Sequence, residues 1–330
     1  MTIDATSTIK PAGLLADEDV LGPMQCWQAA GQRVALVTLT DVEGGAPRQP
    51  GAQMAVAEDG SYAGYLSGGC LEEAIVLEAQ AVIARGANRL VRYGKGSPYF
   101  DIRLPCGSGL DLYFDQALTS QQLVAMAQHR ASRAPFVLRT NLLSGASEVD
   151  IADASLPVAA SRRVGDIFEH VYPPPLQLLL LGTGPGLVSI AVLAATLGIE
   201  LIVLSFDETT RAVLKPFGGY TIIDEAGLTA ALARLDFASA AVLVLHEHDK
   251  EPNILAALLQ TRCYYIGALG NHAVHRERLA ALSLRRISEA DLRRIRAPVG
   301  SIPGAKSKAT LAVGVLTQLM AEAKALNLIS

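Results

Sequence analysis

The chain has 330 residues, which is long for a single hydrophobic core and indicates two domains. Half of its residues are hydrophobic, but its longest apolar runs fall far short of the roughly 20 residues that a membrane helix requires. Its net charge of −4, with no basic stripe, argues against nucleic acid as a partner.

The N-terminus, MTIDATSTIK, lacks the basic and then apolar pattern of a secretory signal, so we expect a cytoplasmic protein. The chain has four cysteines, which form no CxxC pair and have no regular spacing. They do not indicate a disulfide framework, and a reducing compartment would keep them as thiols.

The pattern of apolar runs and turns in the N-terminal part of the chain predicts a compact α/β unit. Asp59-Gly60 lies between two short apolar runs and is a strong hairpin signal, because this pair readily adopts the positive φ angles of tight hairpin turns. The expected elements, in chain order, are a helix at 14–31, a strand at 34–40, a Gly/Pro loop at 41–51 and two paired strands at 54–57 and 62–66.

Two short segments surround a cysteine with glycines: Ser-Gly-Gly-Cys-Leu-Glu at 67–72 and Pro-Cys-Gly-Ser-Gly at 105–109. Glycine has no Cβ, so such loops let the backbone come close to a bound group. The apolar spacing predicts a helix at 72–85, whose N-terminus would favour the thiolate form of Cys70. We expect Cys70 and Cys106 to lie together at one pocket mouth. The alternative is that both are small buried hydrophobic residues beside turns.

The stretch from 115 to 175 is polar or rich in Ala and Ser, with a possible strand at 136–139. It ends in Pro173-Pro174-Pro175, a stiff and extended spacer. We interpret it as the end of the first domain and a connector. The expected boundaries are 1–118 for the first domain, 119–175 for the connector and 176–330 for the second domain.

The second half begins with a strand at 177–181, a Gly-Thr-Gly-Pro-Gly turn, a helix at 188–197 and a strand at 201–204. This is the βαβ pattern of a Rossmann-like fold, in which a phosphate would sit on the helix N-terminus beside Gly182 and Gly184. Two positions depart from the dinucleotide fingerprint. Leu187 stands where glycine or alanine is required, and Ser205 where a carboxylate would hold the ribose. We therefore expect the fold without turnover of a nicotinamide cofactor.

Histidines follow the next two predicted strands, at 240–245 and 264–266. Ligands collect at the carboxyl ends of strands in open α/β sheets, and imidazoles bind divalent ions, so His246 and His248 are candidate metal ligands. The alternative is that these two side chains only form hydrogen bonds around a polar crevice.

These motifs resemble the XdhC/CoxI family of accessory proteins for molybdenum hydroxylases, over nearly the whole chain. In the first half the resemblance rests on Gly45-Ala46-Pro47-Arg48, residues 51–54, Asp59-Gly60, residues 64–72 and Cys106-Gly107. In the second half it rests on Gly182-x-Gly184, His246-x-His248 and residues 265–270, 297–300 and 304–306. The departures lie mostly at the Rossmann crevice and are Pro185, Ser205, Asn271-His272, Lys308 and Thr310.

The resemblance implies an N-terminal α/β domain, a C-terminal Rossmann-like parallel-sheet domain and the function of a chaperone rather than an enzyme. Such a chaperone transiently binds the molybdenum cofactor, a molybdopterin in mono- or dinucleotide form, supports its sulfuration and inserts it into an apo molybdenum hydroxylase of the xanthine dehydrogenase or aldehyde oxidase type. A cysteine desulfurase or another cofactor-modifying enzyme is the expected second partner, and a homodimer is the expected assembly.

The residues implied in cofactor binding combine thiols for the metal end with backbone amides and a guanidinium for anionic groups. They are Cys70, Cys106, Gly68, Gly69, Glu72, Arg48, Gly107, Gly182 and Gly184. Two other classes stay open. An NAD(P)-dependent oxidoreductase with a degenerate fingerprint would need an acid or base, which only His246, Glu247 and His248 offer, and a structural interaction protein would need neither thiol.

Overall fold

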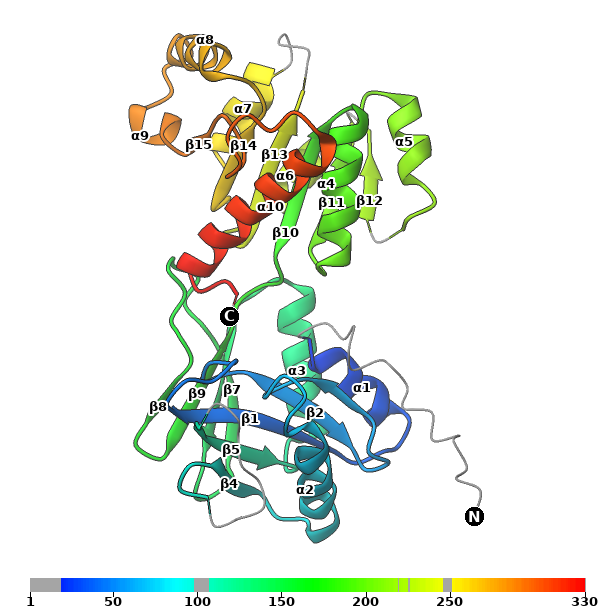
Figure 1. The fold of residues 1–330 in the computed structure, drawn as a ribbon, viewed down its shortest axis with the longest axis vertical. Coiled ribbons are helices and arrows are strands. Elements are labelled where there is room, and N and C mark those ends of the chain that lie inside the picture. Colours follow the sequence, from blue (N-terminus) through cyan, green and yellow to red (C-terminus); the bar gives the residue numbers. More distant parts are fainter. Residues whose placement is uncertain (1–18, 98–106, 219, 225, 246–250, 330) are drawn as a thin grey trace. The chain divides into compact units, whose positions relative to one another are not determined.

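The computed structural model of the protein describes residues 19–97, 107–218, 220–224, 226–245 and 251–329. The chain divides into two compact units (Figure 1). The first unit holds the residues up to Asp153 and Ala159–Tyr172, and the second unit holds Ala154–Val158 and Pro173–Ile329.

The first unit contains an antiparallel sheet whose strands are β1 (Val34–Glu43), β2 (Gln53–Ala57), β3 (Tyr62–Gly64), β4 (Arg89–Gly94) and β5 (Gly109–Asp115). They lie in the order β3-β2-β1-β5-β4. The pairing of β2 with β3 confirms the hairpin predicted around Asp59-Gly60. Because side chains alternate along a strand, Ala35 and Val37 of β1 face one core cluster and Leu36 faces another.

Helix α2 (Glu72–Arg85) packs against the face of β1 that carries Ala35 and Val37, and it has the predicted bounds. It ends at Gly86 in the left-handed conformation, which glycine adopts without steric cost. The helix expected at 14–31 is shorter, since α1 spans Leu21–Ala29, and residues 14–18 lie outside the described part of the chain.

The opposite face of this sheet packs against a second antiparallel sheet and helix α3 (Ser120–Ala131). The strands of the second sheet are β6 (Phe136–Asn141), β7 (Ser147–Ile151), β8 (Arg162–Val164) and β9 (Ile167–Tyr172), in the order β7-β6-β9-β8. The sequence pattern predicts a connector at 119–175, whereas most of this stretch is regular structure of the first unit. The reason is that Phe136 and Leu138 are buried with Leu36 in one core.

The second unit is built on a parallel sheet of β10 (Gln177–Gly182), β11 (Glu200–Leu204), β12 (Tyr220–Ile223), β13 (Ser239–Val244), β14 (Tyr265–Ala268) and β15 (Ile295–Arg296). The strand order is β12-β11-β10-β13-β14-β15, and every pair is parallel. The order reverses between β10 and β13, which is the place where ligands bind in doubly wound sheets. The predicted Rossmann-like parallel sheet is therefore present.

Helices cover both faces of the parallel sheet (Figure 1). Leu179 and Leu181 share a core with Leu255 of α7, while α4 and α10 pack together over the other face. The helices of this unit are α4 (Gly184–Thr196), α5 (Glu208–Leu214), α6 (Gly227–Ala233), α7 (Glu251–Leu259), α8 (His272–Ser283), α9 (Glu289–Leu292) and α10 (Lys308–Ala325). Across the described ranges, none of the helices has the length and apolar character needed to cross a membrane.

Candidate functional site

The loops that carry the sequence motifs of the first unit meet at one end of its five-stranded sheet. Glu43 at the end of β1 pairs with Gly109 at the start of β5, and Met54 near the start of β2 pairs with Gly64 at the end of β3. The loops at 44–52 and 65–71 and the residues just before β5 therefore lie at the same end of the sheet.

Arg48 of the first loop contacts Tyr65, which directly precedes the glycine-cysteine loop. Its Cζ atom lies 4.5 Å from the centroid of the Tyr65 ring, and its Nη1 donates a hydrogen bond of 2.9 Å to the Tyr65 hydroxyl. Gly44, at the start of the first loop, lies close to Ser108, which follows Gly107. A Cβ atom placed on Gly44 would be 3.6 Å from the Cα atom of Ser108. These contacts bring the three predicted motifs, around Arg48, Cys70 and Gly107, to one place.

The glycine-cysteine loop is organised by the Glu72 carboxylate, which is buried at the start of α2. Its Oε1 accepts hydrogen bonds from the amides of Leu66 and Ser67, at 3.1 and 2.8 Å. Its Oε2 accepts from the Ser67 hydroxyl at 2.6 Å and from the amides of Gly69 and Leu71 at 2.8 and 3.2 Å. The loop therefore folds around an anion that the chain itself supplies.

These hydrogen bonds fix the protonation state of Glu72. Burial alone would raise its pKa, but hydrogen bonds from the Ser67 side chain and amide and from neighbouring amides outweigh burial and hold the pKa below its usual value of 4.5. The side chain is therefore a carboxylate at neutral pH, and it can accept all five bonds.

Ser67 completes the loop and leaves the Cys70 thiol on the surface. The Ser67 Oγ accepts from the amides of Cys70 and Leu71, at 3.1 and 2.8 Å. Gly68, Gly69 and Cys70 are exposed, and neither glycine has another heavy atom within 4 Å of the position that a Cβ would take. The loop thus presents one free thiol on a firmly held backbone with open space around it.

This geometry changes the roles expected of two predicted residues. The Gly69 amide proton is directed to Glu72, so it is not placed to bind a phosphate of a cofactor. Both carboxylate oxygens of Glu72 accept hydrogen bonds from the loop that carries Cys70, so this side chain holds that loop in place. The sequence alone could not separate these roles, because the motif shows which residues gather but not that the carboxylate turns back onto its own loop.

The second predicted thiol, Cys106, lies outside the described residues, so its proximity to Cys70 stays a prediction. Gly107, which follows it, is exposed and has a φ of +68°, a conformation that favours glycine. Its open surroundings are compatible with the close approach of a bound group.

Charged side chains that the sequence did not single out also lie at this end of the sheet. Arg92 of β4 pairs with Glu43 and with Asp111, and Lys95 lies 2.6 Å from Glu43. Lys95 and then Arg92 hold the pKa of Glu43 below its usual value. Nothing local in the sequence shows that the end of β4 lies beside the start of β5, which is why these residues were not predicted.

The glycine turn of the second unit is tightly built. Gly182 has a φ of +139°, and a Cβ atom there would overlap the carbonyl oxygen of Val244 in the neighbouring strand. Gly184 begins α4, and its amide donates a hydrogen bond of 2.9 Å to the hydroxyl of Thr210. In a dinucleotide site this region of the turn faces a phosphate. Here the Gly184 amide already donates its hydrogen bond to the Thr210 hydroxyl oxygen, so it is not free to bind a phosphate.

The residues at the position that would hold a ribose form hydrogen bonds with their own neighbours in the chain. Ser205 is buried at the end of β11, and its hydroxyl lies 3.4 Å from the Asp207 carbonyl oxygen. The Asp207 carboxylate accepts from the amides of Thr209 and Thr210 at the start of α5 and from the Thr210 hydroxyl. Asp207 therefore caps a helix and cannot replace the missing ribose ligand without breaking that cap.

His246 and His248, the predicted metal ligands, lie outside the described part of the chain. In the part that is described, no group of three or more His, Cys, Asp or Glu side chains is placed to hold a metal ion.

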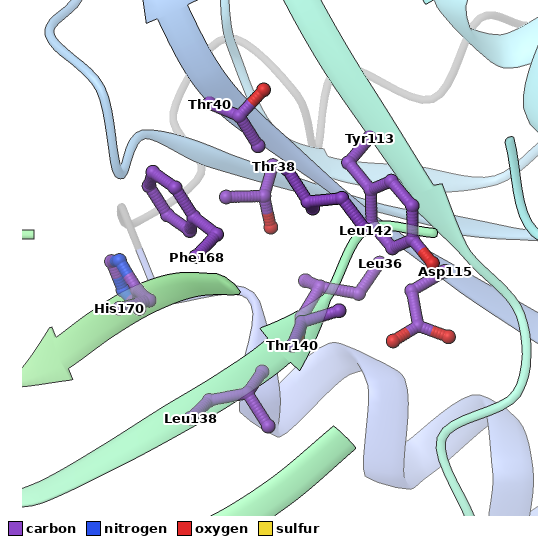
Figure 2. A pocket seen from close by; sticks show the side chains of 10 residues that line it. All are labelled: Leu36, Thr38, Thr40, Tyr113, Asp115, Leu138, Thr140, Leu142, Phe168 and His170. Carbon is purple, nitrogen blue, oxygen red and sulfur yellow. The ribbon is translucent and has the colours of Figure 1, made fainter. Parts of the chain in front are cut away.

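A small cavity between the two sheets of the first unit is a separate feature (Figure 2). It has room for about one water molecule. Burial raises the pKa of Asp115 and lowers that of His170 to about 3, so this histidine is neutral at physiological pH. The cavity is too small for a pterin. It is lined by Leu36, Thr38, Thr40, Tyr113, Asp115, Leu138, Thr140, Leu142, Phe168 and His170.

Comparison with known families gives two matches. Residues 27–94 match the model of the XdhC and CoxI family, and residues 178–319 match that of the XdhC Rossmann domain. The first match covers Arg48 and Cys70, and the second covers the glycine turn at Gly182 and Gly184.

Comparison with individual proteins gives long alignments. The chain is 34% identical over 293 residues to the molybdenum cofactor insertion chaperone PaoD of Escherichia coli (strain K12), covering 88% of this chain and 83% of that protein. It is 24% identical over 322 residues to a probable xanthine dehydrogenase subunit of Bacillus subtilis (strain 168), covering 88% and 93%. The crystal structure of a xanthine dehydrogenase from Bacillus halodurans has the same fold, with a TM-score of 0.73, 21% identity and coverage of 93% and 96%.

Proposed function

The chain belongs to the XdhC and CoxI family, and from this premise we propose that it binds the molybdenum cofactor and delivers it to an apo molybdenum hydroxylase of the xanthine dehydrogenase type. The relative named as a molybdenum cofactor insertion chaperone supports this role, because the alignment covers most of both chains. In this role the protein is an accessory factor whose cargo is the cofactor.

The observation that carries the proposal is the exposed Cys70 thiol on the loop that Glu72 holds. A thiolate is a soft ligand suited to a metal bound by sulfur. Arg48 lies at the same end of the sheet, where its guanidinium could form charge-assisted bonds with a phosphate. A reversible ligand for the metal end, combined with a cation for the anionic end, suits a protein that must hold a cofactor and release it.

The finer steps belong to the same proposal. The chain holds the cofactor while a cysteine desulfurase or another cofactor-modifying enzyme carries out its sulfuration. It acts as a homodimer, and Cys106 and Gly107 join Cys70 in contacting the cofactor. Gly182 and Gly184 of the second unit form a scaffold or take a nucleotide part of the cofactor.

A transfer assay tests the proposed function. The purified chain, loaded with cofactor, is mixed with an apo molybdenum hydroxylase of the xanthine dehydrogenase type, and recovery of hydroxylase activity is followed over time. We expect faster and more complete recovery than with the same amount of free cofactor. Equal recovery with free cofactor, or none from the loaded chain, would contradict delivery.

The alternative function, an NAD(P)-dependent oxidoreductase, predicts tight binding of a nicotinamide dinucleotide. We expect weak binding instead, with a Kd in the millimolar range or higher, about −4 kcal/mol or less favourable. The reason is that Thr210 occupies the Gly184 amide and Ser205 stands where a carboxylate is needed. Calorimetry with NAD and NADP measures this directly, and saturable micromolar binding together with steady oxidation of NADH would favour the oxidoreductase.

A further inference from the structure

Helix α8 of the second unit carries a buried arginine at the carboxyl ends of the strands. The side chain of Arg278 is only 2% exposed. Its Nε and Nη2 atoms donate to Oε1 of Glu251 at 3.1 and 2.7 Å, and Nη2 also donates to the carbonyl oxygen of Leu269 at 2.7 Å. Leu269 directly follows β14, and Glu251 is the first residue of α7. The guanidinium is therefore fixed between the starts of two helices.

The third nitrogen of this guanidinium, Nη1, is buried and has no hydrogen-bond partner among the described residues. The same is true of Nδ1 of His275, which lies three residues earlier and hence on the same face of α8. Buried polar atoms in native proteins are nearly always paired, so unpaired nitrogens on both His275 and Arg278 point to a partner outside the described residues. That partner must accept the two N–H bonds of Nη1.

The surroundings favour a negatively charged partner. The first turn of α8 has no acidic residue, and it holds His272 and His275. The helix is capped by the neutral amide of Asn271, whose Oδ1 accepts from the amides of Ala273 and Val274 at 2.8 and 3.0 Å. The partial positive charge of the helix N-terminus thus has no carboxylate in its cap or first turn, while Glu251 compensates the charge of Arg278.

The site also reaches the surface. Asn271, His272 and Ala273 are exposed and His275 is half-buried, so the start of α8 is open to solvent, whereas Arg278 is buried. Desolvation, followed by the charge of Arg278 and by His272, lowers the pKa of His275. An anion bound between His275 and Arg278 would oppose the effect of the Arg278 charge on the pKa of His275.

We propose that the start of α8, His275 and Arg278 form a binding site for a phosphate group, which is either free phosphate or the phosphate of a nucleoside monophosphate. The site lies in the second unit and deepens the proposed function, on which it rests, because the second unit would then have its own place for the phosphate of a nucleotide. Its position at the carboxyl ends of β13 and β14 agrees with where open parallel sheets bind ligands.

Calorimetry of the full chain with inorganic phosphate, and separately with cytidine monophosphate, tests this site. We expect both probes to bind to the unaltered protein. His275→Ala and Arg278→Lys should each weaken binding by about tenfold or more. The lysine retains a cation beside Glu251 but has no second terminal nitrogen, and His275→Ala leaves the ion pair intact. The matched control is Arg276→Ala, an exposed arginine on the same helix, which should bind like the unaltered protein.

The two probes distinguish the source of the phosphate. Tighter binding of the nucleotide indicates a monoester ligand, and equal binding indicates free phosphate. Two results would overturn the proposal. One is that the folded, unaltered protein binds neither probe, which means that water or chain residues outside the described part pair with Nη1 and Nδ1. The other is that Arg276→Ala weakens binding as much as His275→Ala, which means a diffuse attraction to surface charge. Since neither result depends on molybdenum, failure here is distinct from failure of the delivery assay.

Discussion

Replacing Cys70 with alanine is expected to lower the amount of molybdenum cofactor retained by the purified chain by about tenfold or more, a loss of at least about 1.4 kcal/mol of binding free energy. The thiol is exposed, and the loop that carries it is held by hydrogen bonds from its amides to the Ser67 hydroxyl and the Glu72 carboxylate, none of which involves the thiol. The loop should therefore keep its conformation, and the free energy of unfolding should change by no more than about 0.5 kcal/mol. Cofactor content after gel filtration and a thermal melt together measure the two effects.

Cys26 provides the matched control for this substitution, because it is also an exposed free cysteine, located in α1. Cys26→Ala should leave cofactor retention unchanged. Cys263 is buried, and burial raises the pKa of its thiol to about 11, so Cys263→Ala should affect stability rather than cofactor. If Cys70→Ala and Cys26→Ala retain the cofactor equally well, Cys70 is not a ligand.

The second large effect is expected from Glu72→Gln. The glutamine has the same shape, but one of its two polar ends is an NH₂ group, which would face N–H donors wherever it is placed. Either end of the carboxylate accepts at least two hydrogen bonds in the protein. We expect a loss of about 2–4 kcal/mol in the free energy of unfolding and a large fall in cofactor retention. Urea denaturation measures the first, and cofactor content the second.

Glu73→Gln is the matched control, since Glu73 is the exposed neighbour of Glu72 in the first turn of α2. The rate of Cys70 alkylation gives a readout of the positioning role. Glu72→Gln should change the alkylation rate of Cys70, because the loop at 67–72 is no longer held in one conformation. The alkylation rate of Cys26 should stay the same. If stability falls but the Cys70 rate and cofactor retention are unchanged, Glu72 is only structural.

The stability of the protein should also depend on pH through Glu72. The folded state holds the pKa of this carboxyl below the value of 4.5 that it has when unfolded. The unfolded state therefore binds the proton more readily, so the contribution of Glu72 is fully present above about pH 4.5 and is lost as the pH falls through the folded value. The difference in unfolding free energy between the unaltered protein and Glu72→Gln should shrink on acidification, whereas a constant difference would contradict this linkage.

Local patterns predicted much of the fold because local chemistry determines those elements. Asp59-Gly60 specifies a tight turn, and the apolar spacing from Glu72 to Arg85, ended by Gly86, defines α2. In the second sheet of the first unit, the pattern predicted only the strand at 136–139, which lies within β6. Strands β7 and β8 of this sheet have exposed or half-buried side chains, so they show no clear alternation of apolar and polar residues. They are stabilised by pairing with β6 and β9, which a local pattern does not reveal.

The candidate site shows the same division. The glycine-cysteine motif predicted a loop with an accessible thiol, and Cys70 is exposed on such a loop. The partner of each polar group was not predictable. Gly184 and Thr210 are far apart in sequence but share a hydrogen bond, and the Gly69 amide is directed to Glu72 rather than to a ligand. Only the folded backbone decides which donors are already used.

The most direct test of cofactor binding at Cys70 is the molybdenum and pterin content of the full chain purified gently from molybdenum-replete cells, with intact-mass measurement of the complex. We expect molybdenum and pterin in equal amounts on the unaltered protein, with the corresponding added mass, and both reduced by about tenfold on Cys70→Ala. A folded, unaltered protein that carries neither molybdenum nor pterin, although molybdenum hydroxylases from the same cells are fully loaded, would contradict the proposed role.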